Sequence, residues 1–287
     1  MSKISAMPEI SGLDGTEYIP VLKDGANQKL EVIKMLDDIS FNREDFIGGT
    51  FTSSTIFSNV YTVDDTVGGS EDPSEIDVAG DEPSALGIRH NIDQDPETGS
   101  KKTYVYGNKI FVPRVLNDFH FYETRLKMTR SGENPAGLLY LGFSNDVSAA
   151  GITSAGPFVG FYVSILSAVS GDIPYNQITI AAGVTDDTPT NLLYQILTTP
   201  TTCWVETQPM EDAEYTKFGV KLFKDKAEFY LNDVLSHTYT FVGSLFSTTT
   251  QELYASVGCY SYGEDYYGGG SLHHFIDYIS VKSKLVR

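Results

Sequence analysis

Apolar and polar side chains alternate with a period of two along the stretch from Tyr215 to Tyr239. Every second residue from Phe218 to Leu222 is apolar, and the residues between them are glycine or lysine. That period is typical of a strand with one buried face. Two polar dipeptides, Lys224-Asp225 and Asn232-Asp233, separate this run from two further runs, and Asn and Asp tolerate the left-handed backbone of tight turns. The stretch therefore predicts an antiparallel meander whose apolar face packs against a second sheet.

Strand-like runs recur along the rest of the chain with turn residues between them, and long helical periodicities are scarce. Thr103 to Val112 is expected to form a hairpin about Gly107-Asn108, a turn dipeptide. The other runs are Thr50–Val63, Asp118–Met128, Ala136–Phe143, Gly156–Leu166, Gln177–Val184, Asn191–Leu197, Thr202–Thr207, Glu252–Tyr260 and Leu272–Val281. This pattern predicts an all-β fold, a jelly-roll sandwich of two antiparallel sheets.

Residues 1–45 differ from the rest, because their apolar side chains lie in short segments broken by Gly and Pro. Gln28 to Ile39 places its apolar residues near one helical face and predicts a short helix. A segment of this size cannot bury a core of its own, so it docks on its own domain, on a partner or on a sister copy. We therefore expect an N-terminal docking segment over residues 1–45 and a β-sandwich domain over residues 46–287.

The formal net charge is -18 at pH 7, which argues against nucleic acid and anionic membrane as partners. No apolar run approaches the roughly 20 residues of a membrane-spanning helix, and the N-terminus has no apolar signal core. We expect synthesis in a cytoplasm, without secretion or membrane insertion.

No residue pattern predicts a metal or cofactor site. Asp64 to Glu97 is rich in carboxylates on loop-like sequence, which leaves Ca²⁺ as an alternative to a solvated acidic surface, but no Asp-x-Asp-x-Asp-Gly loop is present. His273-His274 cannot chelate together, because adjacent side chains on a strand point to opposite faces; we interpret them as rim residues of a terminal strand. Cys203 and Cys259 each lie beside an aromatic residue, which favours two reduced, packed thiols and leaves a disulfide open.

The most distinctive polar loop is Ser261 to Gly270, which combines tyrosines and carboxylates among glycines. Tyrosine rings stack on sugar faces, and carboxylates accept hydrogen bonds from sugar hydroxyls. The same composition suits adaptable protein contacts, so glycan contact, protein contact and a plain exposed loop all stay open. The candidate binding residues are Tyr262, Glu264, Asp265, Tyr266 and Tyr267.

The N-terminal line ISGLDGTEYIPVLKDG resembles the segment that precedes the main module in virion appendage proteins of tailed phages, such as fibres and head-decorating proteins. The residues that match the pattern are Leu13, Gly15, Glu17, Ile19, Pro20, Val21, Asp24, Gly25 and Lys29. The resemblance implies an anchor to a virion and carries no chemistry. The residues expected to dock are Leu13, Tyr18, Ile19, Pro20, Val21 and Leu22.

Three segments of the body resemble the concanavalin A-like lectin/glucanase superfamily, which includes laminin G-like domains. They are Phe121–Ser144, Ala227–Tyr239 and His273–Leu285, and they occur in the order expected for that superfamily. The resemblance implies the same two-sheet sandwich that the alternation predicts.

Glucanases of this superfamily carry Glu-x-Asp-x-Glu on one strand, which supplies a nucleophile and an acid/base on one face. The corresponding stretch here, Asn145 to Leu166, has Asp146 as its one acid. The nearest match elsewhere, Glu75-Ile76-Asp77, lacks the third acid and lies before the strand that it should follow. We therefore expect no catalytic residues and a protein that is not an enzyme.

The function expected from the sequence is that of a phage virion structural protein: a head fibre, a decoration protein or a tail fibre component. Its sandwich would serve assembly and, as an open alternative, binding of host-surface glycan. The implied partners are capsid, tail or fibre subunits and further copies of the chain, for which the resemblance suggests a trimer. Two alternatives are a polysaccharide-active hydrolase of the glucanase type and a non-viral carbohydrate-binding module.

Overall fold

The computed structural model describes two large antiparallel sheets and a two-stranded hairpin. The described residues are 18–23, 26–31, 39–44, 61–67, 75–77, 85–92, 101–113, 115–132, 135–144, 156–165, 176–185, 203–210, 214–241, 252–263 and 270–284. These residues contain no helix, and hence no helix long and apolar enough to cross a membrane.

One sheet has eight strands in the order β15-β14-β13-β8-β17-β6-β5, with β3 pairing beside this path to β17. Its strands are β3 (Ile39–Glu44), β5 (Glu75–Asp77), β6 (Leu86–Ile92), β8 (Phe119–Gly132), β13 (Thr216–Phe223), β14 (Lys226–Leu231), β15 (Val234–Thr240) and β17 (Gly270–Lys284). The meander from which the sequence analysis began forms β13, β14 and β15 at one side of this sheet.

The other sheet has seven strands in the order β12-β11-β10-β9-β16-β7-β4. Its strands are β4 (Thr62–Val67), β7 (Lys101–Phe111), β9 (Pro135–Ser144), β10 (Gly156–Ile165), β11 (Asn176–Thr185), β12 (Cys203–Met210) and β16 (Glu252–Gly263). The strands within both sheets pair antiparallel.

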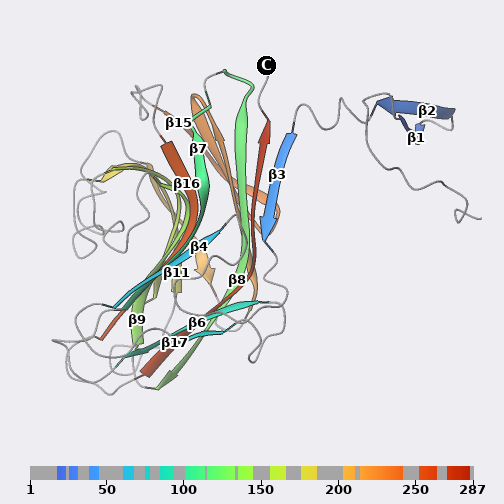
Figure 1. The fold of residues 1–287 in the computed structure, drawn as a ribbon. Coiled ribbons are helices and arrows are strands. Elements are labelled where there is room, and N and C mark those ends of the chain that lie inside the picture. The colour runs from blue at the N-terminus through green and yellow to red at the C-terminus, as the bar shows by residue number, and fades with distance from the viewer. Residues whose placement is uncertain are drawn as a thin grey trace, which may run out of the picture.

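The two sheets face each other across one apolar core (Figure 1). The Phe161 ring of the seven-stranded sheet lies 5.2 Å from Phe218 and 5.7 Å from Phe229 of the other sheet, centroid to centroid. Tyr122 crosses between the sheets, and its hydroxyl donates to the Ser256 carbonyl at 3.1 Å. The predicted fold class, an all-β jelly-roll sandwich of two antiparallel sheets, is confirmed.

The predicted turn at Asn232-Asp233 is confirmed as well. Asn232 has a φ of 49° and Asp233 a φ of 67°, which is the left-handed backbone of a two-residue hairpin turn. The Asn232 side-chain oxygen accepts a hydrogen bond from the Lys217 backbone N–H at 3.0 Å, so the turn is also tied to the neighbouring strand.

Two local predictions are wrong. The short helix expected over Gln28 to Ile39 conflicts with the structure at both ends, where β2 (Ala26–Glu31) pairs with β1 (Tyr18–Lys23), and β3 begins at Ile39. Within residues 1–45, β3 pairs with β17 of the sandwich, and the division of the chain at residue 45 stays a prediction.

The hairpin expected about Gly107-Asn108 is the second error, because β7 continues through these residues. The register with β16 shifts here, so that Tyr106 pairs with Ser256 while Lys109 pairs with Tyr254. Gly107-Asn108 therefore lies opposite one residue of β16, which is a β-bulge. A bulge and a turn favour the same residue types, and the sequence signal alone does not separate them.

Polar groups are buried between the sheets around His90 of β6. Its Nδ1 lies 2.7 Å from the Ser261 hydroxyl and its Nε2 lies 2.9 Å from the Thr103 hydroxyl, so this imidazole links the two sheets. His274 lies beside it with a ring-centroid distance of 5.7 Å, is fully buried, and has no hydrogen-bond partner on either ring nitrogen. The pKa of His90 is lowered by burial and by the neighbouring His274, and burial lowers the pKa of His274 to about 3.

The expectation that His273 and His274 lie on opposite faces is met, because His274 is buried while His273 is half-buried. Their interpretation as rim residues of a terminal strand is wrong. The last strand of the chain, β17, lies between β8 on one side and β6 and β3 on the other. Chain order says nothing about position within a sheet, so the final strand can lie in its centre.

The unpartnered His274 imidazole is expected to destabilise the fold, so that His274→Leu raises the free energy of unfolding by about 1–3 kcal/mol near neutral pH. The gain should grow on acidification. The unfolded chain binds a proton at a pKa near 6.5 and the folded chain does so at about 3. The contribution of neutral His274 to the free energy of unfolding is therefore fully present above about pH 6.5. Below that pH it falls by about 1.4 kcal/mol per pH unit, until the folded chain also binds the proton.

Urea unfolding between about pH 8 and pH 4 measures both effects. His273→Leu, on the opposite face of the same strand, is the matched control and should change stability less and with little pH dependence. A loss of stability in His274→Leu at all pH values would show that the imidazole has a partner or a packing role in the folded chain.

Candidate functional site

Four aromatic rings form a second cluster on the outer side of the seven-stranded sheet, away from the core. They are Tyr104, Tyr140, Phe158 and Tyr162, and we call them the aromatic face. Their neighbours along each strand, such as Val159, point into the core, and side chains alternate between the two sides of a strand. The aromatic face therefore lies on the outer side of β7, β9 and β10.

The register places these rings in a row across the sheet. Tyr104 of β7 pairs with Gly258 of β16, which pairs with Tyr140 of β9, which pairs with Tyr162 of β10. Gly258 permits this arrangement, because a Cβ atom there would lie 2.8 Å from the Tyr104 ring. Centroid distances are 4.2 Å for Tyr140–Phe158 and 4.7 Å for Phe158–Tyr162, so the rings pack against one another as well as on the sheet.

A parallel row of small residues lies between Tyr140 and Phe158 along the strands. It contains Ser256, Gly142 and Gly160, paired in that order. Gly142 has a φ of +148°, and a side chain on Gly160 would collide with the Leu141 carbonyl oxygen. Both positions therefore require glycine, and the floor of the aromatic face is bare backbone at its centre.

Three half-buried tyrosines surround the buried rings. Tyr106 and Tyr260 pack against the cluster, and Tyr254 contacts Tyr106 edge-to-face at 5.8 Å. Lysines cover two of the three, with Lys109 Nζ 5.9 Å from the Tyr254 ring and Lys102 Nζ 5.2 Å from the Tyr260 ring. The outer side of β7 and β16 thus presents tyrosines with cations at both ends.

Two hydroxyls in this region are buried without a hydrogen-bond partner, those of Tyr140 and Ser256. Burial and the adjacent Tyr162 raise the pKa of Tyr140 well above its usual range, although the nearby Ser144 hydroxyl opposes that rise. Tyr140 is therefore a neutral O–H group. A buried hydroxyl without a partner costs about 1–3 kcal/mol.

The paired carboxylates of the glucanase strand are not found on the aromatic face. The strand in the corresponding stretch is β10, and the positions that alternate outward are Phe158, Gly160 and Tyr162. Glu75 and Asp77 lie on β5 at an edge of the other sheet. No group of three or more His, Cys, Asp or Glu suited to a metal ion occurs among the described residues.

The residues predicted to bind ligand are mostly outside the described part of the chain. Glu264, Asp265, Tyr266 and Tyr267 are outside it, and Tyr262 lies near the end of β16. Of the predicted docking residues, Leu13 is outside the described part, and the others form most of β1: Tyr18, Ile19, Pro20, Val21 and Leu22. Their roles stay predictions.

The sequence gives no clear signal for the aromatic face, for a physical reason. In the run from Phe158 to Val163 both sides of the strand are apolar, so the alternation that marks a half-buried strand is absent. The signal available was the spacing of Phe158 and Tyr162 about a glycine.

Cys259 is a free, buried thiol whose pKa is raised by burial. This agrees with the reduced, packed thiol that the sequence favoured at this position.

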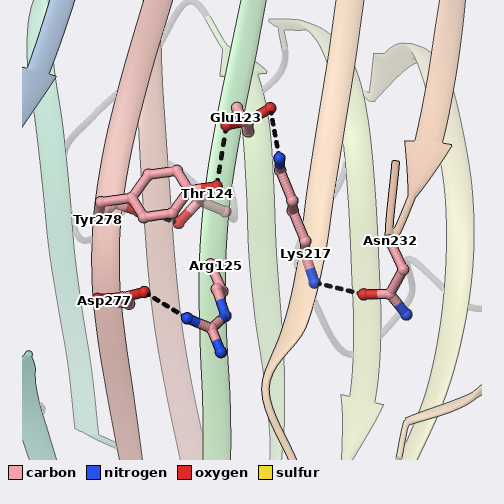
Figure 2. Close-up of polar contacts among 7 residues, drawn as sticks. All are labelled: Glu123, Thr124, Arg125, Lys217, Asn232, Asp277 and Tyr278. Atoms are coloured by element: carbon pink, nitrogen blue, oxygen red, sulfur yellow. Dashed lines mark hydrogen bonds and ion pairs between the residues drawn. The ribbon is translucent and has the colours of Figure 1, made fainter. Parts of the chain in front are cut away.

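The outer side of the eight-stranded sheet has a polar network at its centre (Figure 2). The Glu123 carboxylate accepts a hydrogen bond from the Tyr278 hydroxyl at 2.9 Å and pairs with Lys217 at 3.1 Å. Lys217 also pairs with Asp233 at 2.7 Å. Burial and the carboxylate raise the pKa of Tyr278 to about 12, and burial alone would lower the pKa of Lys217, but its two ion pairs raise it.

No family model matches the chain, and no curated protein sequence is similar to it. The fold is similar to that of an endo-1,3-beta-glucanase from Streptomyces sioyaensis, with 13% identity, a TM-score of 0.46, and coverage of 87% of this chain and 98% of that chain. A non-specific endo-beta-1,3(4)-glucanase from family GH16 shares 12% identity with a TM-score of 0.47, covering 96% and 98%. A family 16 glycosyl hydrolase from Mycobacterium smegmatis shares 13% identity with a TM-score of 0.48, covering 84% and 98%.

At this level of identity the likeness concerns the concanavalin A-like sandwich and establishes no activity. The prediction that the chain is not an enzyme is nevertheless contradicted, because the proteins that share this fold are glycoside hydrolases. That prediction rested on a missing carboxylate strand, and the absence of one catalytic pattern does not exclude other catalytic groups.

The Glu123 network is expected to be structural. Glu123→Gln should lower the free energy of unfolding by about 1–3 kcal/mol, because it removes the charge that holds Lys217 and Tyr278. Arg125→Gln is the control, since Arg125 pairs with Asp277 at 3.0 Å in a more exposed position; it should cost less than about 1 kcal/mol. Chemical denaturation measures both, and equal losses would contradict the assignment of Glu123 as the centre of the network.

Proposed function

We propose that the chain is a polysaccharide-active protein that holds a glycan on the aromatic face of the seven-stranded sheet. The observation that carries this proposal is the set of half-buried tyrosines, Tyr106, Tyr254 and Tyr260, that surrounds the buried aromatic row on the outer side of the sheet. A half-buried tyrosine suits a ligand that has both apolar and polar parts, because its ring is apolar and its hydroxyl is polar.

The chemistry of the face fits a sugar chain better than an apolar ligand. A pyranose has an apolar face that stacks on an aromatic ring and hydroxyls that both donate and accept. The half-buried rings of Tyr106, Tyr254 and Tyr260 offer stacking surfaces.

Cleavage of a bound glycan would need groups other than the usual pair of carboxylates, because β10 presents Phe158, Gly160 and Tyr162. In the register of the sheet, Glu206 of β12 pairs with Thr179 of β11, which pairs with Tyr162. That carboxylate belongs to the same row of residues and is the first candidate for a test of turnover.

The virion role rests on the N-terminal resemblance. The similar structures named above are glycoside hydrolases. We propose attachment through Leu13 and Tyr18 to Leu22, for which loss of particle incorporation on deletion of residues 1–38, which leaves β3 in place, is the test.

Substitution of the tyrosines that rim the aromatic face should weaken glycan binding. Tyr106→Ala and Tyr254→Ala are each expected to reduce affinity by about 3–10-fold, because each removes one stacking ring. Binding is measured by calorimetry against laminarin, mixed-linkage β-glucan, galactan and alginate, and turnover by the release of reducing or unsaturated ends.

Phe121→Ala, on the outer side of the other sheet, is the matched control and should bind the neutral glycans of the panel like the wild type. Two results would contradict the proposal: no binding to any member of the panel, or equal affinity of the wild type and the Tyr106 and Tyr254 variants. If turnover is seen, its loss in Glu206→Gln with unchanged binding would assign that residue to catalysis.

A further inference from the structure

We propose that the outer side of the eight-stranded sheet is a second glycan site, specific for a polysaccharide that bears carboxylate or sulfate groups. This site is distinct from the aromatic face, because the two lie on opposite outer sides of the sandwich. The proposal does not depend on the function proposed above.

Basic side chains outnumber carboxylates on this side of the sheet, although the whole chain carries a net charge of -18. Placement follows from the register, in which core residues such as Tyr122, Leu222 and Ala227 alternate with outward ones. The outward basic residues are Arg89, Arg125, Lys127, Lys217, Lys221, Lys226, Lys282 and Lys284. The outward carboxylates whose side chains the structure describes are Glu123, Glu228, Asp277 and Asp233, the last of which pairs with Lys217. The register with Arg89 adds Glu75 as a further carboxylate position on this side.

Two of these carboxylates, Glu123 and Asp277, pair with Lys217 and Arg125 in the polar network (Figure 2). Toward the Phe119 end of β8 the register runs Glu228–Lys221–Phe121–Lys282 across β14, β13, β8 and β17, so that lysines outnumber the one carboxylate there. We call this end the lysine–phenylalanine strip.

The lysines of the strip lie over aromatic rings. Lys221 Nζ is 4.4 Å from the Phe119 ring centroid and 5.1 Å from that of Phe223. Lys226 Nζ is 4.6 Å from Phe223, and its Glu228 partner lies 2.5 Å away. A cation–π contact uses the face of the ring and leaves ammonium hydrogens directed to solvent, so these amines keep donors for an incoming anion.

Lys282 extends the strip onto β17, with its Nζ 5.9 Å from the Phe121 ring. Phe121 contacts Tyr230 edge-to-face at 5.7 Å, so rings and cations alternate over β14, β13, β8 and β17. Such a surface matches an acidic polysaccharide in two ways. Ring faces stack on the apolar faces of sugars, and ammonium groups pair with carboxylate or sulfate oxygens.

Electrostatics favours this ligand class over a neutral glycan and limits how it binds. At physiological salt the field of a charge extends about 8 Å. An anion at the strip therefore meets the local lysines, while at longer range the acidic chain as a whole repels it. Binding should consequently weaken with added salt, and neutral glucans should show no affinity for this surface.

The test measures binding of the full chain to polygalacturonate, dextran sulfate and laminarin by calorimetry at about 0.02 M and 0.15 M salt. Lys221→Gln combined with Lys282→Gln should lower affinity for the two polyanions by about tenfold or more and leave laminarin binding unchanged. Lys102→Gln combined with Lys109→Gln makes the same charge change on the other sheet and is the control. Equal unfolding midpoints of both double variants confirm that each is folded.

Four results would overturn the proposal. They are no binding of either polyanion, equal loss of binding in the two double variants, polyglutamate binding as tight as that of the polysaccharides, and self-association of the chain that the strip substitutions abolish. The third result would assign the surface to an acidic protein and the fourth to a second copy of the chain. Failure of laminarin binding alone would count against the aromatic face and not against the strip.

Discussion

The structure depends on the burial of two apolar sheet faces against each other. Each sheet has one apolar side whose exposure to water would be unfavourable, and the two apolar sides bury each other. Phe161, Phe218 and Phe229 meet where the two inner sides face each other. Polar groups buried between the sheets also form hydrogen bonds from one sheet to the other. The Tyr122 hydroxyl donates to the Ser256 carbonyl, and the His90 imidazole bonds to two hydroxyls of the opposite sheet. His274 is an exception among these groups.

The inner sides of the two sheets form the core, and the two outer sides differ from each other in chemistry. The seven-stranded sheet carries tyrosines over a floor of bare backbone, with lysines at its ends. The eight-stranded sheet carries lysines over phenylalanines, with a carboxylate network beside them. We propose a neutral sugar chain and an acidic one as the ligands of these two surfaces.

The aromatic face also separates binding from chemistry. In retaining glucanases the strand that lies under the substrate presents carboxylates two residues apart. In this chain the same alternation on β10 presents Phe158, Gly160 and Tyr162, and the Gly142–Gly160 contact leaves no room for a side chain at the middle position. The outward positions of β10 are therefore aromatic or glycine and not charged. Any catalysis must draw on other elements, such as β12.

The amino-acid sequence by itself determined the local structure: the strands of the meander, the left-handed turn at Asn232-Asp233 and the two-sheet fold class follow from alternation and turn chemistry between near neighbours. It misassigned Gln28 to Ile39 as a helix and Gly107-Asn108 as a turn, because short apolar runs and bulges give ambiguous local signals. Only the tertiary structure decided that β17 is interior, that His90 and His274 meet, and that Tyr104, Tyr140 and Tyr162 form one row. Those relations depend on strand order and register between distant segments, which no local pattern encodes.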